Sequence, residues 1–443
     1  MRLPHPFVLM LGGIAVAAVL TWVVPSGEFD RRDDPATGRR IAVAGSYHPV
    51  PPRPVGPFAA VVAIPRGFVE GADVIGVVLF VGGSWALLER LGTMAAVVGA
   101  LLGFFRDRGL VAIPLVSIFF AAMGALENME EEIIALVPVL LALGAGLGID
   151  ATAVVAMSGG AAMLGAAFGP TNPFQAGIAL KLAELPPFSG GFLRLSMFVV
   201  ALAAWVAVTV RYAARTRTHP ARSSHASTVP MSARHGVALL ALLVPMAIYI
   251  YGAIRMDWGF NELSGAFFAG AVVAGLVGGL GLTGTVTAYL EGMRTLFGAA
   301  FMVGLARSIS LVLTDGRVVD SLLQAFVAPL STMPGAATGF LMVPFHALVH
   351  LAVPSVSGQA VLTMPLVVPL SDLLGLSRQV PVLAYQVGAG LCELFTPTNG
   401  ALMAILLAAG VPYERWIRFA AVAVLAPVAV GLAGIAAAMW LGT

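Results

Sequence analysis

The residues best suited to chemistry are charged side chains that stand inside long apolar stretches. Four glutamates, Glu127, Glu130, Glu131 and Glu132, fall within six residues between two apolar runs. Charged side chains are costly at membrane depth, and neighbouring carboxylates repel one another. We therefore expect at least one of these glutamates to carry a proton or to bind a cation. The alternative is that the cluster caps a helical hairpin at its wet cytoplasmic base.

Two further charged residues, Arg307 and Glu393, also interrupt apolar sequence. A guanidinium group can bind a carboxylate through two parallel hydrogen bonds. Arg307 is therefore expected either to bind a substrate carboxylate or to pair structurally with a glutamate. Glu393 lies three residues before Thr396, which directly precedes a polar break in the chain, and this favours a coupling role. We assign Glu130, Glu131 and Glu393 to the coupling of Na⁺ or H⁺, and we expect no other cofactor.

The polar break occurs twice, as Pro-Thr-Asn at 170–172 and again at 397–399. A helix broken in mid-membrane exposes backbone amides at one new end and carbonyls at the other, which suit anionic groups and cations respectively. A single copy could merely kink its helix, whereas two symmetric copies favour a binding site. A second polar segment, at 354–359, adds hydroxyl and amide groups. The predicted substrate-binding residues are Thr171, Asn172, Thr398, Asn399, Ser355, Ser357, Gly358, Gln359 and Arg307.

The two breaks belong to an internal duplication. At an offset of 227 residues their flanks align without a gap, with Pro138 on Pro365 and Phe168 on Phe395. In each copy a polar segment divides two apolar runs ahead of the broken span. Irregular backbone at membrane depth is tolerated only inside protein or beside water. We therefore predict two repeats, each with a re-entrant hairpin and a broken transmembrane helix.

The composition is that of a membrane protein. Hydrophobic residues make up 59% of the 443, and charged residues only 10%. A soluble fold of this length could not bury so much apolar surface. The net charge of +2 gives no reason to expect a nucleic-acid partner. The chain is predicted to be an all-α polytopic membrane protein whose partners are a small-molecule solute and the lipid bilayer, and a homodimer is left open.

The apolar runs predict about 13 membrane crossings, two of which are assigned to short runs at 92–105 and 318–333. One predicted span precedes the first repeat and eight precede the second, so the repeats would enter the membrane from opposite faces, an inverted topology. The predicted parts are a first helix with an extracytoplasmic loop (1–57), the first repeat (58–213), a basic cytoplasmic linker (214–236), two linking helices (237–290) and the second repeat (291–443).

The distribution of arginine predicts the orientation. Residues 211–235 carry five arginines and no acid. By the positive-inside rule this linker is cytoplasmic, and the loop at 26–57 is extracytoplasmic. The first span then reads as an uncleaved anchor. We predict a bacterial cytoplasmic (inner) membrane protein with its amino terminus in the cytoplasm and its carboxyl terminus outside.

Motifs for metal or hydrolytic chemistry are missing from the sequence. His346 and His350 lie one helical turn apart, but position 347 is alanine, so the metalloprotease pattern H-E-x-x-H is absent. There is no phosphate-binding loop, nucleophile elbow or cysteine pair. We predict no metal site and no enzyme activity. A channel would need a continuous polar pore, and an intramembrane enzyme would need a catalytic set, so both are alternatives of low weight.

Three segments carry a resemblance to a known family, namely 357–365, 375–379 and 411–416, supported by Gly45-Ser-Tyr-His48 and Met129-Glu-Glu131. The chain resembles the YfcC family, within the group of C4-dicarboxylate anaerobic carriers (DcuC-like) and basic amino acid antiporters. The resemblance covers nearly the whole chain. It implies an ion-transporter architecture of two inverted repeats and either dicarboxylates or arginine/ornithine-type substrates. The sequence departs from the family pattern at Gly390-Leu-Cys-Glu393 and at the triple glutamate 130–132.

The family resemblance and the candidate site residues together predict a secondary active transporter that moves a small charged organic solute, a carboxylate or an amino acid, across the cytoplasmic membrane. Transport would be coupled to an ion or proceed by exchange. The alternative within the class is a basic amino acid antiporter, which the acidic cluster at 127–132 favours and Arg307 opposes.

Overall fold

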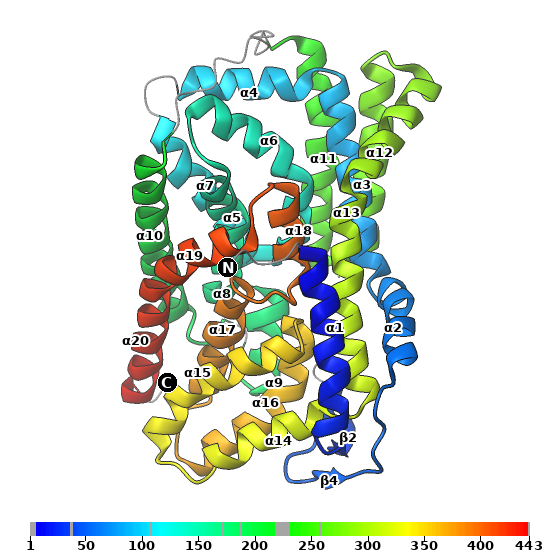
Figure 1. The fold of residues 1–443 in the computed structure, drawn as a ribbon. Coiled ribbons are helices and arrows are strands. Elements are labelled where there is room, and N and C mark those ends of the chain that lie inside the picture. The colour runs from blue at the N-terminus through cyan, green and yellow to red at the C-terminus, as the bar shows by residue number, and fades with distance from the viewer. Residues whose placement is uncertain are drawn as a thin grey trace.

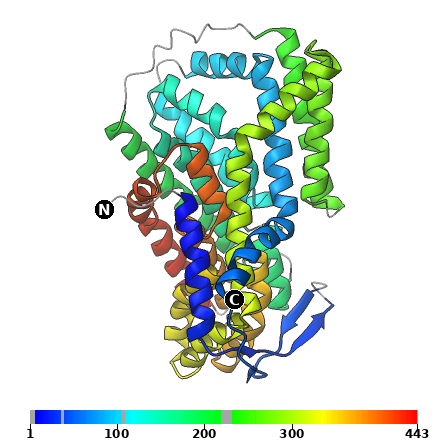
Figure 2. The same cartoon turned by 45° about the vertical axis from the view of Figure 1, so that its right-hand side comes forward.

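The computed structural model describes residues 6–35, 39–105, 109–170, 172–186, 188–217, 231–256 and 258–441. The protein is mostly helical, at 79%. Helix α1 (Pro6–Val23) leads to a small polar loop with two antiparallel strand pairs, β1 (Gly27–Glu28) with β4 (His48–Pro49) and β2 (Arg31–Asp34) with β3 (Arg39–Ala42). Figures 1 and 2 place this loop at the lower end of the molecule.

The first half of the chain continues with helices that include a hairpin and a broken segment. They are α2 (Pro57–Glu70), α3 (Ala72–Arg90), α4 (Thr93–Phe104), η1 (Gly109–Val111), α5 (Ala112–Glu127), α6 (Glu131–Leu147), α7 (Ala151–Val155), the π-helical turn η2 (Ala156–Gly160), α8 (Ala161–Phe168), the π-helical turn η3 (Pro173–Gly177), α9 (Ile178–Leu182) and α10 (Gly191–Arg215).

Two helices, α11 (Ala233–Arg255) and α12 (Phe260–Val277), join the halves and pack beside α3. The second half repeats the order of hairpin and break. Its helices are α13 (Gly281–Asp315), α14 (Val319–Leu330), α15 (Gly335–Ala352), α16 (Val356–Leu373), α17 (Gln379–Glu393), α18 (Gly400–Ala408), α19 (Tyr413–Ala423) and α20 (Leu425–Leu441).

Within the described residues, eight helices are long and apolar enough to cross a membrane, or nine if α19 and α20, which meet at a bend of 44°, form one span. The predictions of crossings at 92–105 and 318–333 are wrong. Helices α4 and α14 have 12 residues each, which is about 18 Å against a hydrocarbon core of about 30 Å. Figure 1 shows both lying across the long axis of the molecule, at opposite ends.

The hairpins and breaks fall where the sequence predicts them. Helices α5 and α6 meet at residues 128–130, and α15 and α16 meet at 353–355. The chain leaves helical geometry between Phe168 and Pro173, and again between Glu393 and Gly400. The tight approach of α5 to α8 depends on glycine, because a Cβ on Gly124 would lie 2.0 Å from the Ala162 carbonyl oxygen. Small residues of this kind let transmembrane helices pack backbone to backbone.

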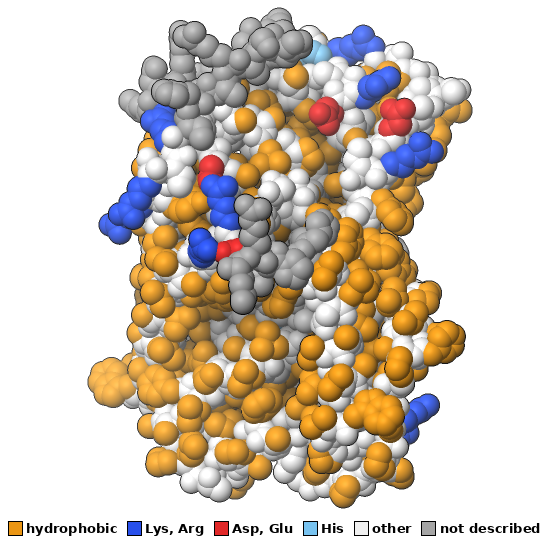
Figure 3. All heavy atoms as spheres, in the orientation of Figure 1, with side chains coloured by type: hydrophobic (Ala, Val, Ile, Leu, Met, Phe, Trp, Pro, Cys, Tyr) orange, Lys and Arg blue, Asp and Glu red, His pale blue; other side chains and the backbone are white. Residues whose placement is uncertain are grey.

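The surface agrees with a bilayer environment. In Figure 3 the lower part of the visible face is almost uniformly apolar, and the charged side chains gather toward the upper part. Two predictions from the sequence fall outside the described residues: most of the linker 214–236, of which 218–230 is not described, and Thr171. The side chain of Glu127 is likewise not described.

Candidate functional site

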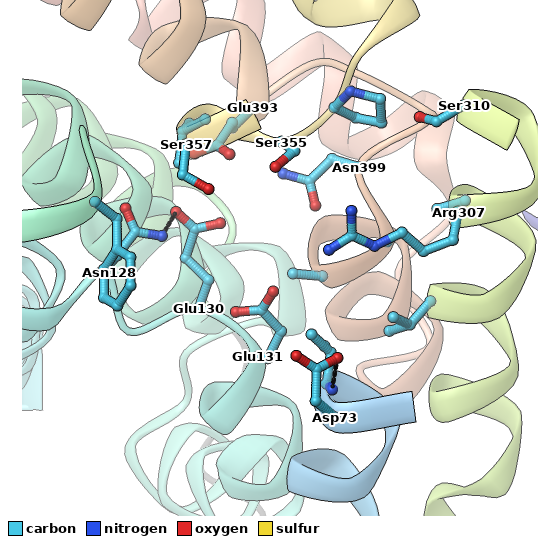
Figure 4. A pocket seen from close by; sticks show the side chains of 18 of the residues that line it. Asp73, Asn128, Glu130, Glu131, Arg307, Ser310, Ser355, Ser357, Glu393 and Asn399 are labelled. Atoms are coloured by element: carbon cyan, nitrogen blue, oxygen red, sulfur yellow. Dashed lines mark hydrogen bonds between the residues drawn. The ribbon is translucent and has the colours of Figure 1, made fainter. Parts of the chain in front are cut away.

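The two hairpin tips and the ends of both broken segments meet around one cavity of about 320 Å³. Figure 4 shows its polar side chains converging on the space. They come from both halves of the chain and from widely separated helices. The polar lining residues are Asp73, Asn128, Glu130, Glu131, Arg307, Ser310, Ser355, Ser357, Glu393 and Asn399, and Phe174 and Phe260 supply aromatic surface.

Five of the described α-helices begin at this cavity. Helices α3, α6, α12, α16 and α18 each contribute residues of their first turn or N-cap to its lining. A helix amino terminus carries a partial positive charge from its unpaired amides, which stabilises nearby anions. Asp73 and Glu131 lie in the first turns of α3 and α6, so these carboxylates stand where the backbone favours them.

The tip of the first hairpin is formed by Asn128. It adopts a left-handed conformation, with φ of 59°, which allows the chain to reverse between α5 and α6. Its amide oxygen accepts a hydrogen bond of 2.9 Å from Asn172 Nδ2, which also donates to the Gly124 carbonyl at 3.1 Å. Asn172 thus ties the first break to the first hairpin, and it is fully buried behind the cavity wall.

Glu130 and Glu393 face each other from opposite halves of the protein. Glu130 is only 3% exposed and Glu393 only 5%, and both line the cavity on the same side, as Figure 4 shows. Asn128 Nδ2 lies 3.4 Å from Glu130 Oε1. An ionised carboxylate only accepts hydrogen bonds, so two carboxyl groups can bond to each other only when one of them holds a proton.

The second hairpin presents hydroxyl groups to the cavity. Ser355 caps α16 by accepting a hydrogen bond from the Gly358 amide at 3.3 Å, and both Ser355 and Ser357 line the space. Gln359 points away from it. Its Nε2 donates to the His346 carbonyl at 2.8 Å, and its Oε1 lies 2.9 Å from His350 Nδ1.

The second break places Asn399 at the cavity and turns Thr398 away. Asn399 Oδ1 accepts from the Leu402 amide at 3.0 Å, which caps α18. The Thr398 hydroxyl donates to the Leu351 carbonyl at 3.2 Å and fastens the break to α15. The same Pro-Thr-Asn motif therefore contributes an asparagine to the lining in the second half only.

Arg307 reaches into the cavity from α13. Figure 4 shows its guanidinium group pointing into the open space near Asn399 and Glu131. It makes no hydrogen bond or ion pair within 4 Å to any residue in the part of the chain that the structure describes. Glu131 and Asp73 line the same cavity as Arg307.

Seven residues singled out from the sequence therefore line the cavity: Glu130, Glu131, Arg307, Ser355, Ser357, Glu393 and Asn399. Asn172, Gly358, Gln359 and Thr398 do not. Sequence reasoning missed Asp73, Asn128, Ser310, Phe174 and Phe260. Asp73 is a lone acid at the start of an apolar run, and Asn128 lies inside the acidic cluster, so both carried a usable signal.

The arrangement suits binding of a small charged molecule. The described lining offers four carboxyl groups, one guanidinium group and several neutral hydrogen-bonding groups. No group of three or more histidine, cysteine, aspartate or glutamate side chains among the described residues has the geometry to hold a metal ion. The side chains could bind, orient and exchange protons with a solute.

The chain is similar to known membrane transporters. Residues 3–440 match the family model of the C4-dicarboxylate anaerobic carrier, DcuC. The chain is 28% identical over 476 residues to the Putative basic amino acid antiporter YfcC of Escherichia coli (strain K12), covering 95% of this chain and 93% of that protein. It is 26% identical to an uncharacterized protein of Haemophilus influenzae, covering 94% and 93%.

Two solved transporters align over nearly the whole length. They are YdaH from Alcanivorax borkumensis, with 17% identity, a TM-score of 0.44 and coverage of 99% and 98%, and MtrF from Neisseria gonorrhoeae, with 16% identity, a TM-score of 0.45 and coverage of 97% and 95%. The family match spans almost all of the chain. The protein therefore belongs to the C4-dicarboxylate anaerobic carrier (DcuC) family, as a YfcC-type multi-pass membrane transporter.

Proposed function

We propose that the protein is a secondary active transporter of a small carboxylate-bearing solute, and that Arg307 binds the carboxylate. The observation that carries this proposal is the guanidinium group of Arg307, which projects into the cavity without a partner among the described side chains. A buried or half-buried arginine normally has an anionic partner. A solute carboxylate supplies it.

The architecture supports a carrier rather than a channel. The cavity lies where both hairpins and both breaks converge, and its volume of about 320 Å³ suits a small metabolite. We propose that the two halves are inverted repeats with re-entrant hairpins, which rock around this site. In support, the short helices α4 and α14 occupy matching places in the two halves and lie at opposite ends of the molecule.

The charges favour an amino acid over a dicarboxylate. Around Arg307 the lining carries Asp73, Glu130, Glu131 and Glu393. A solute with only carboxylates would be repelled by most of these groups, whereas one that also has an ammonium group would be attracted to them. The name of the Escherichia coli relative, a basic amino acid antiporter, points in the same direction. We propose exchange of basic amino acids across the cytoplasmic membrane.

A C4-dicarboxylate is the second candidate. The amino termini of α16 and α18 both open onto the cavity beside Arg307, and three positive centres could hold two carboxylates. The family model, named for a C4-dicarboxylate carrier, points to this solute class.

Counterflow into proteoliposomes tests both candidates. Vesicles that contain the purified protein and unlabelled L-arginine should accumulate external labelled L-arginine, and vesicles loaded with succinate should not accumulate labelled succinate. Arg307→Lys should raise the KM about tenfold or more, which is about 1.4 kcal/mol, because an ammonium group cannot reproduce the planar two-bond contact. Arg294→Lys, an exposed position on the same helix α13, is the matched control.

Two results would contradict these proposals. A folded Arg307→Ala protein that binds and exchanges its solute with wild-type affinity would remove Arg307 from the site. Accumulation of succinate but not of L-arginine would select the dicarboxylate.

A further inference from the structure

We propose that Glu130, Glu393 and His350 form a proton-coupling group, in which the two carboxyl groups share one proton and the imidazole is its second acceptor. The proposal rests on the proposed transport function and adds the identity of the coupling ion. Its parts are a carboxyl pair that joins the two halves and a buried histidine whose free nitrogen faces that pair.

The carboxyl pair spans the two halves of the protein. Glu130 belongs to the tip between α5 and α6, and Glu393 is the last residue of α17. Both are almost fully buried and line the same side of the cavity. In the described part of the chain, no arginine or lysine lies within 4 Å of either carboxyl group. A proton held between them leaves one buried negative charge instead of two, because a protonated carboxyl group can donate a hydrogen bond to an ionised one.

The tautomer of His350 follows from its neighbours. Gln359 Nε2 donates to the His346 carbonyl, so Gln359 Oε1 is the atom that faces His350 Nδ1, at 2.9 Å. An amide oxygen only accepts, so Nδ1 of His350 carries the hydrogen and Nε2 carries the lone pair. Nε2 is fully buried, makes no hydrogen bond among the described residues and lies 3.7 Å from Glu393 Oε1. A small closure would let it accept a proton from Glu393.

Other charged and titratable groups surround the carboxyl pair. Glu131 on α6 and Asp73 on α3 add negative charge to the cavity that Glu130 and Glu393 line, and Arg307 on α13 is the cation in its described lining. Glu132 lies beside Glu130 and accepts from its amide at 3.2 Å. His346 is one turn before His350 on α15, and Cys392 and Tyr385 belong to the same helix as Glu393. A pair of carboxyl groups in such surroundings retains its proton because a second negative charge would be repelled.

A proton fits the group better than a sodium ion. Hard cations bind oxygen ligands, whereas one of the three groups here is an imidazole nitrogen. The chemical step breaks one O–H bond on a carboxyl group and forms an O–H bond on the other or an N–H bond on His350, without electron transfer. When the hairpin tip moves away from α17, the repulsion that keeps the proton bound is removed and the proton is released. Conformation and proton binding are thereby linked.

Infrared spectroscopy on the purified full-length protein in lipid tests the shared proton without a solute. The wild type should show the C=O stretching band of a protonated carboxyl group at neutral pH. Glu130→Gln and Glu393→Gln should each lose it, and Glu291→Gln, an exposed carboxyl group on α13, should keep it. Glutamine preserves the shape, and either of the two variants suffices if the other does not fold. A missing band in the wild type, or a band unchanged in both variants, overturns the proposal.

Transport of L-arginine in proteoliposomes tests the coupling. A pH gradient should drive accumulation in the wild type, with proton movement reported by a pH-sensitive dye inside the vesicles, and Glu393→Gln should lose at least about tenfold of this accumulation. His350→Gln should keep the infrared band but lose pH-driven accumulation. Accumulation that follows a sodium gradient and ignores pH overturns proton coupling. A wild type that keeps the band but shows no L-arginine counterflow would instead contradict the proposed amino acid transport.

Discussion

Arg194 shows how a buried arginine can be purely structural. It is 1% exposed, and all its hydrogen bonds go to neutral acceptors. Its Nε donates to Gln386 Oε1 at 2.6 Å and its Nη2 donates to Gln379 Oε1 at 2.8 Å, while Nη1 contacts the Ser189 carbonyl. Gln386 in turn donates to the Gly169 carbonyl at the first break. This network fastens α10 and the first break to α17, whereas Arg307 has no such partners.

We predict that Arg194→Gln lowers the melting temperature of the detergent-solubilised protein and leaves the KM of the folded fraction near that of the wild type. The substitution leaves the Gln379 and Gln386 amide oxygens without their donor, and each unsatisfied buried group costs about 1–3 kcal/mol. Arg211→Gln, an exposed arginine on the same helix α10, is the control. Equal melting of the two variants would show that the Arg194 network contributes no stability.

The sequence predicts which charged residues lie at the cavity better than it predicts which way the polar side chains near the breaks point. Arg307, Glu131 and Glu393 stand around the cavity, and their proposed roles remain predictions. Gln359 and Asn172 carry the same functional groups as cavity residues but turn into the protein to satisfy backbone carbonyls. Whether a polar side chain near a break faces the solute or the backbone depends on a turn of a few residues, which the residue type does not encode.

In both Pro-Thr-Asn segments the asparagine oxygen caps the helical segment that follows, but the asparagine amide nitrogen has different surroundings in each. In the first, Asn172 Oδ1 accepts from the Phe174 and Gln175 amides, both at 2.9 Å, and in the second, Asn399 Oδ1 accepts from Leu402. The amide nitrogen of Asn172 is occupied by Gly124 and Asn128. That of Asn399 has no hydrogen-bond partner among the described residues and borders the cavity. Both polar groups of the first asparagine are thus occupied by the protein, whereas the amide nitrogen of the second faces the cavity.

Aspartate at each position separates these roles, because it keeps the capping oxygen and removes the donor. We predict that Asn172→Asp lowers the melting temperature, since its carboxylate meets the Gly124 carbonyl and the Asn128 amide oxygen. Asn399→Asp should melt near the wild type and weaken binding of a carboxylate-bearing solute by about tenfold or more, through the added negative charge beside Arg307. Thermal melts with and without L-arginine give both quantities. If the two variants behaved alike, the asymmetry between the breaks would be falsified.

Helix directions were the part of the architecture that composition could not supply. The apolar runs at 92–105 and 318–333 form helices as expected, but α4 and α14 lie across the ends of the molecule. The predicted span at 296–313 is the second part of α13, whose 35 residues extend about 52 Å. The first half of α13 contains Glu291 and Arg294. These charges lower its hydropathy, so the apolar pattern does not reveal that this part belongs to the same helix. Hydropathy therefore detects burial in lipid and not the orientation or full length of a helix.

The orientation of the whole molecule remains a prediction that labelling can test. Figure 1 places the strands β2 and β4 at the lower end and the start of α11 at the upper end. Arg53, after the strands, and Met231, just before α11, are both exposed. Cys392 is the only cysteine of the chain, so Cys392→Ala gives a background without thiols in which Arg53→Cys and Met231→Cys can be labelled singly.

We predict that a membrane-impermeant maleimide labels Arg53→Cys in intact cells and labels Met231→Cys only after the membrane is opened. The physical reason is the linker around Met231, where five arginines and no acid fall within residues 211–235, because segments rich in arginine are retained on the cytoplasmic side. The Cys392→Ala background should remain unlabelled in both conditions. Labelling of both sites from the same side would contradict this orientation. It would place the strands and the linker on one face of the membrane, whereas Figure 1 shows them at opposite ends of the molecule.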